Sequence, residues 1–333
     1  MQENLAGISR KLHRLPATDR RDAPLALLEA VSADSTVERI PLLLLHGATF
    51  GAPMFDLPLA GYSMQAFLAQ CGWRNFALDI RGYGRSLPSA TLDAPADANA
   101  PYARLNDAVD DLAAGVEFVL AQTGSDRVNI VSFSWGTVVA CAYAEANAQL
   151  IERLVLYAPL YAEVNDLWID RIADPGDRTR INPALGSYRW VGEVDLLSRW
   201  DADIPENADI RDFREDTVPA AILKALADAA PASNGSAKSA FRAPTGALVD
   251  LFEIFNGRPL YNPRRISAPT LVIRGSDDTT STNTDAQKLF DMLGAVEKKV
   301  ISISPGSHFL CVERNAQDLF NAIDTFLRPV QGR

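Results

Sequence analysis

Val131-Ser132-Phe133-Ser134-Trp135-Gly136 is the stretch of this 333-residue chain that decides its fold. It continues the mainly apolar run 127–131 and leads into a run of small residues, 137–144. A strand, a tight turn with a central serine and a helix in direct succession are typical of a nucleophile elbow, which holds a serine hydroxyl at the carboxyl edge of a sheet. Negative charge that develops beside that hydroxyl faces the amino terminus of the helix. The stretch therefore predicts Ser134 as a catalytic nucleophile.

Apolar runs typical of buried strands alternate with helical patterns on both sides of this turn. The strands predicted in addition to the one before the turn cover residues 40–45, 74–79, 153–159, 269–275 and 299–303. Apolar residues at helical spacing predict one amphipathic helix over residues 105–119 and another over 316–327. Such alternation indicates an α/β fold with a mostly parallel central sheet and helices on both faces.

One long segment, residues 161–262, interrupts the alternation because it contains no clear buried strand. A loop of that length without structure of its own is uncommon in a compact domain. The segment carries large aromatic side chains, namely Trp168, Tyr188, Trp190, Trp200, Phe213, Phe241, Phe252 and Phe255. We therefore predict a helical lid, or cap, over 161–262, inserted into a core domain made of residues 1–160 and 263–333.

Composition and charge narrow the class of protein further. Apolar residues make up 47% of the chain, so a sizeable core is expected. The formal net charge of −10 argues against nucleic acid or an anionic membrane as the main partner but does not identify a substrate. The expected partner is a small-molecule substrate. Cys71, Cys141 and Cys311 lie far apart and lack the spacing of a zinc site, so we expect reduced thiols and no metal. The dinucleotide fingerprint at Gly82-x-Gly84 is incomplete, so no cofactor is expected.

Targeting signals and membrane-spanning segments bear on the expected location of the protein. Residues 1–5 do not resemble the start of a secretory signal, and no apolar run approaches the roughly 20 residues that span a bilayer. A cytoplasmic location is therefore the expectation, and the oligomeric state is left open.

Four motifs follow one another in a fixed order: Leu45-His46-Gly47, the turn-rich 79–86, the elbow, and Gly275-Ser276-Asp277-Asp278, with the pair His308-Phe309 after them. In this order the chain resembles the α/β-hydrolase superfamily, of the lidded esterase, dehalogenase and epoxide-hydrolase type, over roughly residues 23–327. The superfamily pattern at the elbow is Gly-x-Ser-x-Gly, and Ser132 stands where the first Gly is usual. Because strand and helix approach closely there, the position requires a small residue, and serine is small.

A serine hydroxyl needs a base to become nucleophilic, and the chain has three histidines. His13 lies in a polar amino-terminal segment and is expected to be solvated, while the resemblance implies a structural role for His46. His308 is therefore the predicted base. The superfamily pattern Gly-x-x-Asp implies Asp278 as the acid that fixes the tautomer of His308, in preference to Asp277, which would be solvated or would cap the segment that follows.

Two backbone N–H groups are expected to form the oxyanion hole. Trp135 directly follows the nucleophile and supplies the first. The second should come from the loop after Gly47, with Ala48 favoured over Thr49. The residues expected to line the substrate pocket are Thr49, Phe50, Trp190 and Phe252. Aromatic residues around this loop indicate an apolar or aromatic group in the substrate.

Hydrolysis of a small-molecule ester through an acyl-enzyme is the activity that these residues favour, in the manner of a carboxylesterase. Hydrolysis of a C–C bond, a lactone or an amide would use the same triad and stays open, as does perhydrolysis as a side activity. Related C–C hydrolases usually have a Gly-rich stretch after His-Gly, whereas this chain has Ala48-Thr49-Phe50-Gly51, which disfavours that option. Dehalogenase and epoxide-hydrolase chemistry is disfavoured because those enzymes have Asp in place of Ser134. A non-catalytic ligand-binding protein is the alternative from a different class.

Overall fold

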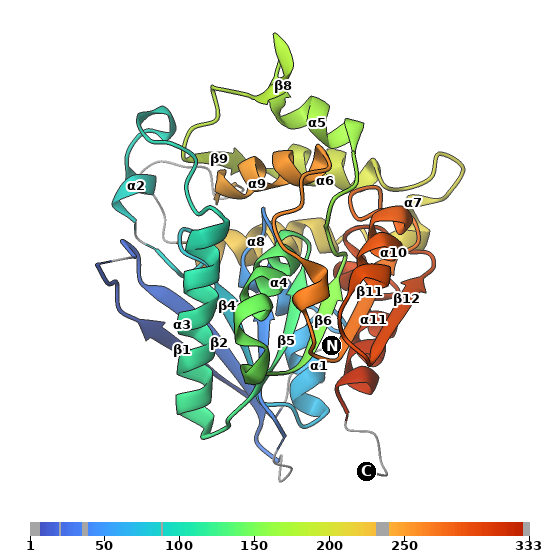
Figure 1. Ribbon diagram of the computed structural model, residues 1–333. Coiled ribbons are helices and arrows are strands. Elements are labelled where there is room, and N and C mark those ends of the chain that lie inside the picture. The colour runs from blue at the N-terminus through green and yellow to red at the C-terminus, as the bar shows by residue number, and fades with distance from the viewer. Residues whose placement is uncertain (1–6, 20, 35–38, 88, 231–239, 329–333) are drawn as a thin grey trace.

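The computed structural model describes residues 7–19, 21–34, 39–87, 89–230 and 240–328, and an eight-stranded sheet forms its centre (Figure 1). The strand order is β1-β2-β4-β3-β5-β6-β11-β12. The strands are β1 (Ile8–Leu15), β2 (Leu25–Ser32), β3 (Leu42–Leu45), β4 (Asn75–Asp79), β5 (Val128–Phe133), β6 (Ile151–Tyr157), β11 (Thr270–Gly275) and β12 (Lys298–Ile303). Only the pairs β1–β2 and β2–β4 among these strands are antiparallel. The predicted mostly parallel sheet is thus confirmed.

Helices cover both faces of the sheet, because the side chains of a strand alternate between its two sides. Along β3, Leu43 and Leu45 face one side and Leu42 and Leu44 face the other, and all four are buried. The first side is covered by α3 (Leu105–Thr123), α4 (Trp135–Asn147) and α10 (Asn283–Met292), and the second by α1 (Met64–Gln70) and α11 (Ala316–Leu327). The predicted α/β-hydrolase arrangement of sheet and helices is therefore present, and the three cysteines are free thiols.

The segment of residues 161–262 lies across the carboxyl edge of the sheet, at the top of Figure 1. Its described helices are α5 (Asp166–Ile172), α6 (Glu193–Asp201), α7 (Ile210–Phe213), α8 (Val218–Ala229) and α9 (Gly246–Phe255). It also contains strands, β7 (Ala173–Asp174) paired with β8 (Asp177–Ile181), and β9 (Tyr188–Val191) paired with β10 (Phe241–Pro244). The sequence predicted helices alone. These strands are two to five residues long and have no continuous apolar run, so no periodic pattern indicates them.

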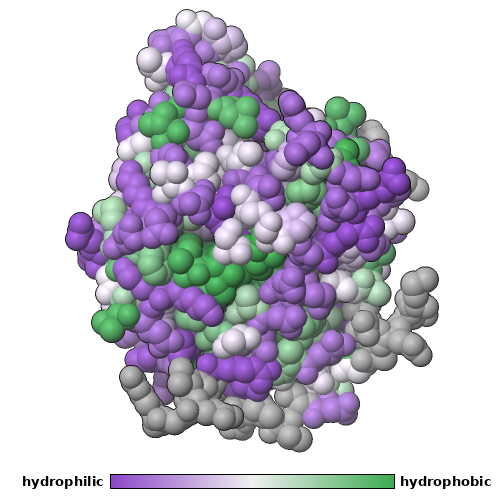
Figure 2. Space-filling view, turned by 90° about the vertical axis from the view of Figure 1, so that its right-hand side faces the viewer, coloured by the Kyte–Doolittle hydropathy of each residue, from purple (hydrophilic) through white to green (hydrophobic). Residues whose placement is uncertain are grey.

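The side of the molecule that carries β12 is mostly hydrophilic, with its largest apolar area at mid-height and smaller apolar areas elsewhere (Figure 2). β12 is an edge strand and begins with Lys298 and Lys299, whose charges oppose edge-to-edge association with another sheet. Within the described ranges, no helix combines the length and the apolar character that crossing a membrane would require.

Candidate active site

Ser134 occupies a sharp turn between β5 and α4, with φ 55° and ψ −125°. A positive φ is unfavourable for a residue with a Cβ atom and persists only where the surroundings enforce it. Here the N–H of Ser134 donates to the carbonyl of Tyr157 at 2.9 Å, and its carbonyl accepts the N–H of Thr137 at 2.8 Å. The turn is thus tied to the neighbouring strand on one side and to its own helix on the other.

Strand and helix approach each other as closely as the elbow pattern predicts. A Cβ atom on Gly136 would lie 2.3 Å from the carbonyl oxygen of His46, so only glycine fits there. Ser132 fits at the first position of the pattern because it is small and its hydroxyl donates to the carbonyl of Val155 at 3.0 Å. The departure from glycine at this position therefore leaves the turn intact.

The loops after β11 and β12 bring Asp278 and His308 to Ser134. Nδ1 of His308 lies 2.8 Å from Oδ2 of Asp278, and Nε2 lies 2.9 Å from Oγ of Ser134. Oδ1 of Asp278 accepts the N–H groups of Thr280 at 2.9 Å and Ser281 at 2.7 Å. Ser134, Asp278 and His308 are each at most 4% exposed. A carboxylate that holds the proton on Nδ1 leaves Nε2 free to accept the proton of the serine hydroxyl.

Asp277 points away from this group of side chains. Its carboxylate accepts the hydroxyl of Ser276 at 2.6 Å and the N–H of Gly306 at 3.2 Å. Of the two expectations for Asp277, the one that it caps the following segment is wrong, because Thr282 is the residue that caps α10. The structure thus brings Asp278, and not Asp277, into contact with the imidazole.

His13 is not solvated, which corrects the sequence-based expectation. It is 9% exposed, its Nε2 lies 2.6 Å from Oε2 of Glu29, and its ring packs beside Phe76 and Phe118. β1 is polar on average, yet alternation along the strand turns the side chain of His13 toward the helix-covered face. His13 is remote from Ser134 in the fold and takes no part in the site.

His46 is completely buried at the end of β3. Its Nδ1 donates to the carbonyl of Gly47 at 2.8 Å and its Nε2 accepts the N–H of Ile80 at 3.0 Å. Burial lowers the pKa of His46 to about 4, so the ring is neutral at ordinary pH. These contacts fit the structural role that the resemblance implies, because they fix the loop that follows Gly47.

The two N–H groups expected to bind an oxyanion flank Ser134. Trp135 is the first residue of α4, so its N–H has no acceptor within the helix. Gly47 packs against the nucleophile, since a Cβ atom on it would lie 2.9 Å from Cβ of Ser134, and the peptide N–H of Ala48 follows directly. Across the described residues neither N–H has an acceptor. Both are therefore available to a ligand.

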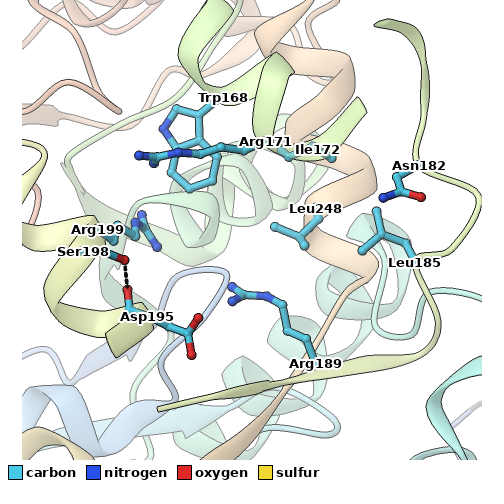
Figure 3. Close-up of a pocket in the computed structure, with 10 residues that line it drawn as sticks. All are labelled: Trp168, Arg171, Ile172, Asn182, Leu185, Arg189, Asp195, Ser198, Arg199 and Leu248. Carbon is cyan, nitrogen blue, oxygen red and sulfur yellow. Dashed lines mark hydrogen bonds between the residues drawn. The ribbon is translucent and has the colours of Figure 1, made fainter. Parts of the chain in front are cut away.

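A cavity of about 350 Å³ lies within the inserted segment above these loops (Figure 3). It adjoins the loop after β11 that carries Asp278, here called the acid loop, because the indole N–H of Trp168 in the cavity wall donates to the hydroxyl of Thr280 at 3.0 Å. It also adjoins the loop after β12 that carries His308, here called the base loop, because the guanidinium of Arg199 lies 5.7 Å from the ring of Phe309. Its lining consists of Trp168, Arg171, Ile172, Asn182, Leu185, Arg189, Asp195, Ser198, Arg199 and Leu248.

None of the four expected pocket residues belongs to the lining of this cavity, but Thr49 contacts two residues that do. Thr49 is 4% exposed, and its hydroxyl oxygen accepts hydrogen bonds from Arg189 at 3.0 Å and Arg199 at 3.3 Å. Phe50 is buried and its ring lies 5.7 Å from that of Phe309, the residue after the predicted base. Thr49 therefore lies at the edge of the cavity, and Phe50 packs against the loop that carries the predicted base.

Trp190 and Phe252 do not belong to the lining. Trp190 is 44% exposed, because alternation along β9 points Arg189 into the cavity and turns Trp190 the other way. Phe252 is 3% exposed and packs in the core, whereas Leu248, one turn earlier on α9, faces the cavity. The sequence indicated the right elements here and the wrong side chains.

Two buried carboxylates that sequence reasoning missed hold the base loop in place. Asp203, from the inserted segment, accepts the N–H of His308 at 3.0 Å and the N–H of Thr279 at 3.2 Å, and burial raises its pKa. Glu313 accepts the N–H of Ser307 at 2.9 Å, and burial raises its pKa to about 7. No motif marks either residue. Searched over the described ranges, the chain has no group of three or more His, Cys, Asp or Glu side chains that could hold a metal ion.

Comparison with known proteins defines the class to which this fold and site belong. Residues 40–315 match the family model of the alpha/beta hydrolase fold, and the chain belongs to that family, which supports hydrolase activity. The chain is 29% identical to a proline iminopeptidase from Xylella fastidiosa (strain Temecula1 / ATCC 700964) over 116 residues, which are 35% of this chain and 31% of that protein. The alignment thus spans about a third of the relative.

Solved structures show the same fold along almost the whole chain. A hydrolase from Pseudomonas aeruginosa PA01 superposes with a TM-score of 0.61 at 20% identity, over 96% of this chain and 99% of the other. An esterase from Exiguobacterium antarcticum superposes with a TM-score of 0.62 at 14% identity, over 95% and 99%.

Proposed function

We propose that this protein is a serine hydrolase that cleaves a small-molecule ester through an acyl-enzyme intermediate. The observation that carries the proposal is the buried chain of contacts Asp278–His308–Ser134, with separations of 2.8 Å and 2.9 Å. A positive-φ serine at the start of a helix, beside two backbone N–H groups without acceptors, supports the same conclusion.

In the proposed reaction, Oγ of Ser134 attacks the ester carbonyl while its proton passes to Nε2 of His308. The carbonyl oxygen becomes negative and is stabilised by the N–H groups of Trp135 and Ala48. When the tetrahedral intermediate collapses, the alcohol leaves with the proton from His308. Water then loses a proton to His308, attacks the acyl-enzyme, and releases the acid and the free serine. Asp278 holds the Nδ1 side of the ring and stabilises the imidazolium.

We propose the lid role for residues 161–262 because the cavity in this segment adjoins both the acid loop and the base loop. A volume of about 350 Å³ suits a small molecule rather than a polymer. Ile172, Leu185 and Leu248 form an apolar wall, which suits the carbon skeleton of such a substrate.

Amide cleavage is the second candidate function, and the specific observation that favours it is the partial similarity to a protein named proline iminopeptidase. Both reactions begin with attack by the same serine, so they differ in the leaving group that His308 must protonate. C–C bond and lactone hydrolysis remain alternatives on the same triad without an observation of their own.

The direct test is covalent labelling with a fluorophosphonate, which reacts with activated serines. We expect the wild type to be labelled, Ser134→Ala and His308→Ala to lose labelling, and Ser125→Ala, which changes a half-buried serine of the loop before β5, to retain it. Turnover of p-nitrophenyl acetate should fall by roughly 10³-fold or more in the first two variants. Hydrolysis of prolyl p-nitroanilide in preference to the ester would favour the second candidate. A folded wild type that neither labels nor turns over esters would contradict the proposal.

A further inference from the structure

Two arginines of the inserted segment converge on the cavity from different elements, Arg189 from β9 and Arg199 from α6 (Figure 3). Both donate to one neutral acceptor, the hydroxyl of Thr49, at 3.0 Å and 3.3 Å. The Nε atom of each guanidinium is buried without a hydrogen-bond acceptor among the described residues, and neither side chain pairs there with a carboxylate. Two positive groups are thus held side by side without an ion pair among the described residues, although Asp203 and Asp278 act electrostatically on Arg199, and Asp195 on Arg189, from farther away.

Several arginines that the fold buries have an ion-pair partner, and two others, Arg21 and Arg274, donate to backbone carbonyls instead. Arg81 is 4% exposed and lies 2.8 Å from Asp111, and Arg153 is 8% exposed and lies 2.6 Å from Glu297. Burial of an ionised group is costly unless it is paired and hydrogen-bonded. Arg189 and Arg199 are half-buried, and among the described residues their guanidinium groups have neither a paired carboxylate nor a backbone carbonyl as acceptor, only the hydroxyl of Thr49.

The unfavourable burial of these two charges lowers the pKa values of both arginines. Burial lowers the pKa of Arg189, and burial with a contribution from Arg189 lowers that of Arg199 to about 10. Both groups are still protonated at neutral pH. Arg199 is partly compensated by Trp168, whose ring centroid lies 4.8 Å from its guanidinium carbon. That contact leaves the Nε atoms of both guanidinium groups without an acceptor.

The remaining charges around the cavity do not neutralise the pair. Asp195 is the one acidic residue of the lining, and it is exposed and accepts the N–H of Gly192 at the start of α6. Arg171, on the opposite wall, adds a third positive group. The lining thus combines three arginines with one aspartate, so its charge favours an anion.

We propose that Arg189 and Arg199, together with Thr49, bind a carboxylate group of the substrate. The planar guanidinium groups match the geometry of a carboxylate and can supply the donors that it needs. The inference rests on the proposed function, because it places this carboxylate on the same small molecule whose ester bond Ser134 cleaves.

The position of Thr49 limits the length of that molecule. Thr49 directly follows Ala48, whose N–H faces the reacting carbonyl, and consecutive Cα atoms are about 3.8 Å apart. The carboxylate and the ester carbonyl are therefore separated by a short carbon chain. A half-ester of a small dicarboxylic acid has this form, and its methylene groups suit the apolar wall at Leu248.

The test compares two esters that differ in charge, mono-p-nitrophenyl glutarate and its methyl ester, with Ser134→Ala protein as the background for spontaneous hydrolysis. We expect the wild type to prefer the free carboxylate in kcat/KM by at least tenfold. Arg189→Gln and Arg199→Gln should reduce that preference by roughly 10- to 100-fold, mainly through KM. Arg180→Gln is the matched control, because Arg180 lies on β8, outside the lining, and should leave the preference unchanged.

Calorimetric titration of glutarate and of dimethyl glutarate into the wild type tests the carboxylate subsite without any variant. The test therefore stands even if a variant does not fold. Binding of the diacid alone supports the subsite, and equal or absent binding of both overturns it. Fluorophosphonate labelling separates the two proposals: labelled protein without charge preference refutes the carboxylate subsite alone, whereas unlabelled protein that binds glutarate refutes the hydrolase mechanism alone. Binding of inorganic phosphate in place of glutarate would overturn the assignment to a carboxylate.

Discussion

Asp278→Asn keeps the size of the side chain but replaces one carboxylate oxygen by an NH2 group. Oδ1 accepts the N–H groups of Thr280 and Ser281, and Oδ2 lies 2.8 Å from Nδ1 of His308. If the amide oxygen stays on the two backbone donors, the NH2 group must face Nδ1. The imidazole proton then moves to Nε2, and Nε2 can no longer accept the proton of Ser134.

The opposite orientation of the amide would restore the tautomer but would direct the NH2 group at two buried backbone N–H groups. Each buried donor without an acceptor costs about 1–3 kcal/mol. The active orientation is therefore higher in free energy by about 2–6 kcal/mol, which corresponds to a population between roughly 4% and less than 0.01%. We expect kcat to fall by roughly 30-fold to 10⁴-fold, because only this fraction of the molecules has a competent base.

Asp277→Asn is the matched control, since Asp277 contacts Ser276 and Gly306 and not the imidazole. Steady-state hydrolysis of p-nitrophenyl acetate by both variants, with thermal unfolding to confirm that both are folded, measures the difference. We expect less than about a threefold loss in the control, within the usual effect of a substitution away from the reacting groups. Equal losses in the two variants would refute the assignment of Asp278 as the acid.

The structure supports three further predictions. Asp203→Asn should lower kcat for p-nitrophenyl acetate by about tenfold with little change in KM. The reason is that a backbone N–H next to this side chain, such as that of His308, loses an acceptor worth about 1–3 kcal/mol. A proportional change in KM would instead indicate a role in substrate binding. His46 has a folded pKa of about 4, below the unfolded value of 6.5, so it stabilises the fold above pH 6.5, and about 3 kcal/mol is lost as pH falls through 4. Urea unfolding should show the stability gap between wild type and His46→Gln shrinking from pH 6.5 to 4, and a constant gap would contradict the neutral ring. Gly136→Ala should destabilise the fold by about 1–3 kcal/mol or more, since its Cβ would meet backbone at 2.3 Å; an unchanged urea midpoint would show that the helix moves freely.

Those features that depend on local pattern could be predicted from the sequence. A parallel strand buried on both faces needs a continuous apolar run, as in Leu42–Leu45, and the elbow needs small residues at fixed spacing around Ser134. The order of the motifs then indicated which acid and which histidine meet at the serine. β1 and β2 were missed, because β1 is polar along much of its length and its buried residues, such as His13, are held by tertiary contacts.

The inserted segment resisted prediction because its side-chain directions depend on packing against the core. In a four-residue strand such as β9, a shift of one position exchanges Arg189 for Trp190, and nothing in the local sequence distinguishes the two faces. The same segment supplies Arg199 on α6 and, two residues after the end of that helix, Asp203, which holds the N–H of His308. The proposed binding of the substrate carboxylate and the positioning of His308 therefore depend on one helix. A carboxylate bound at Arg199 would restrain α6 and, through Asp203, the imidazole that the reaction requires.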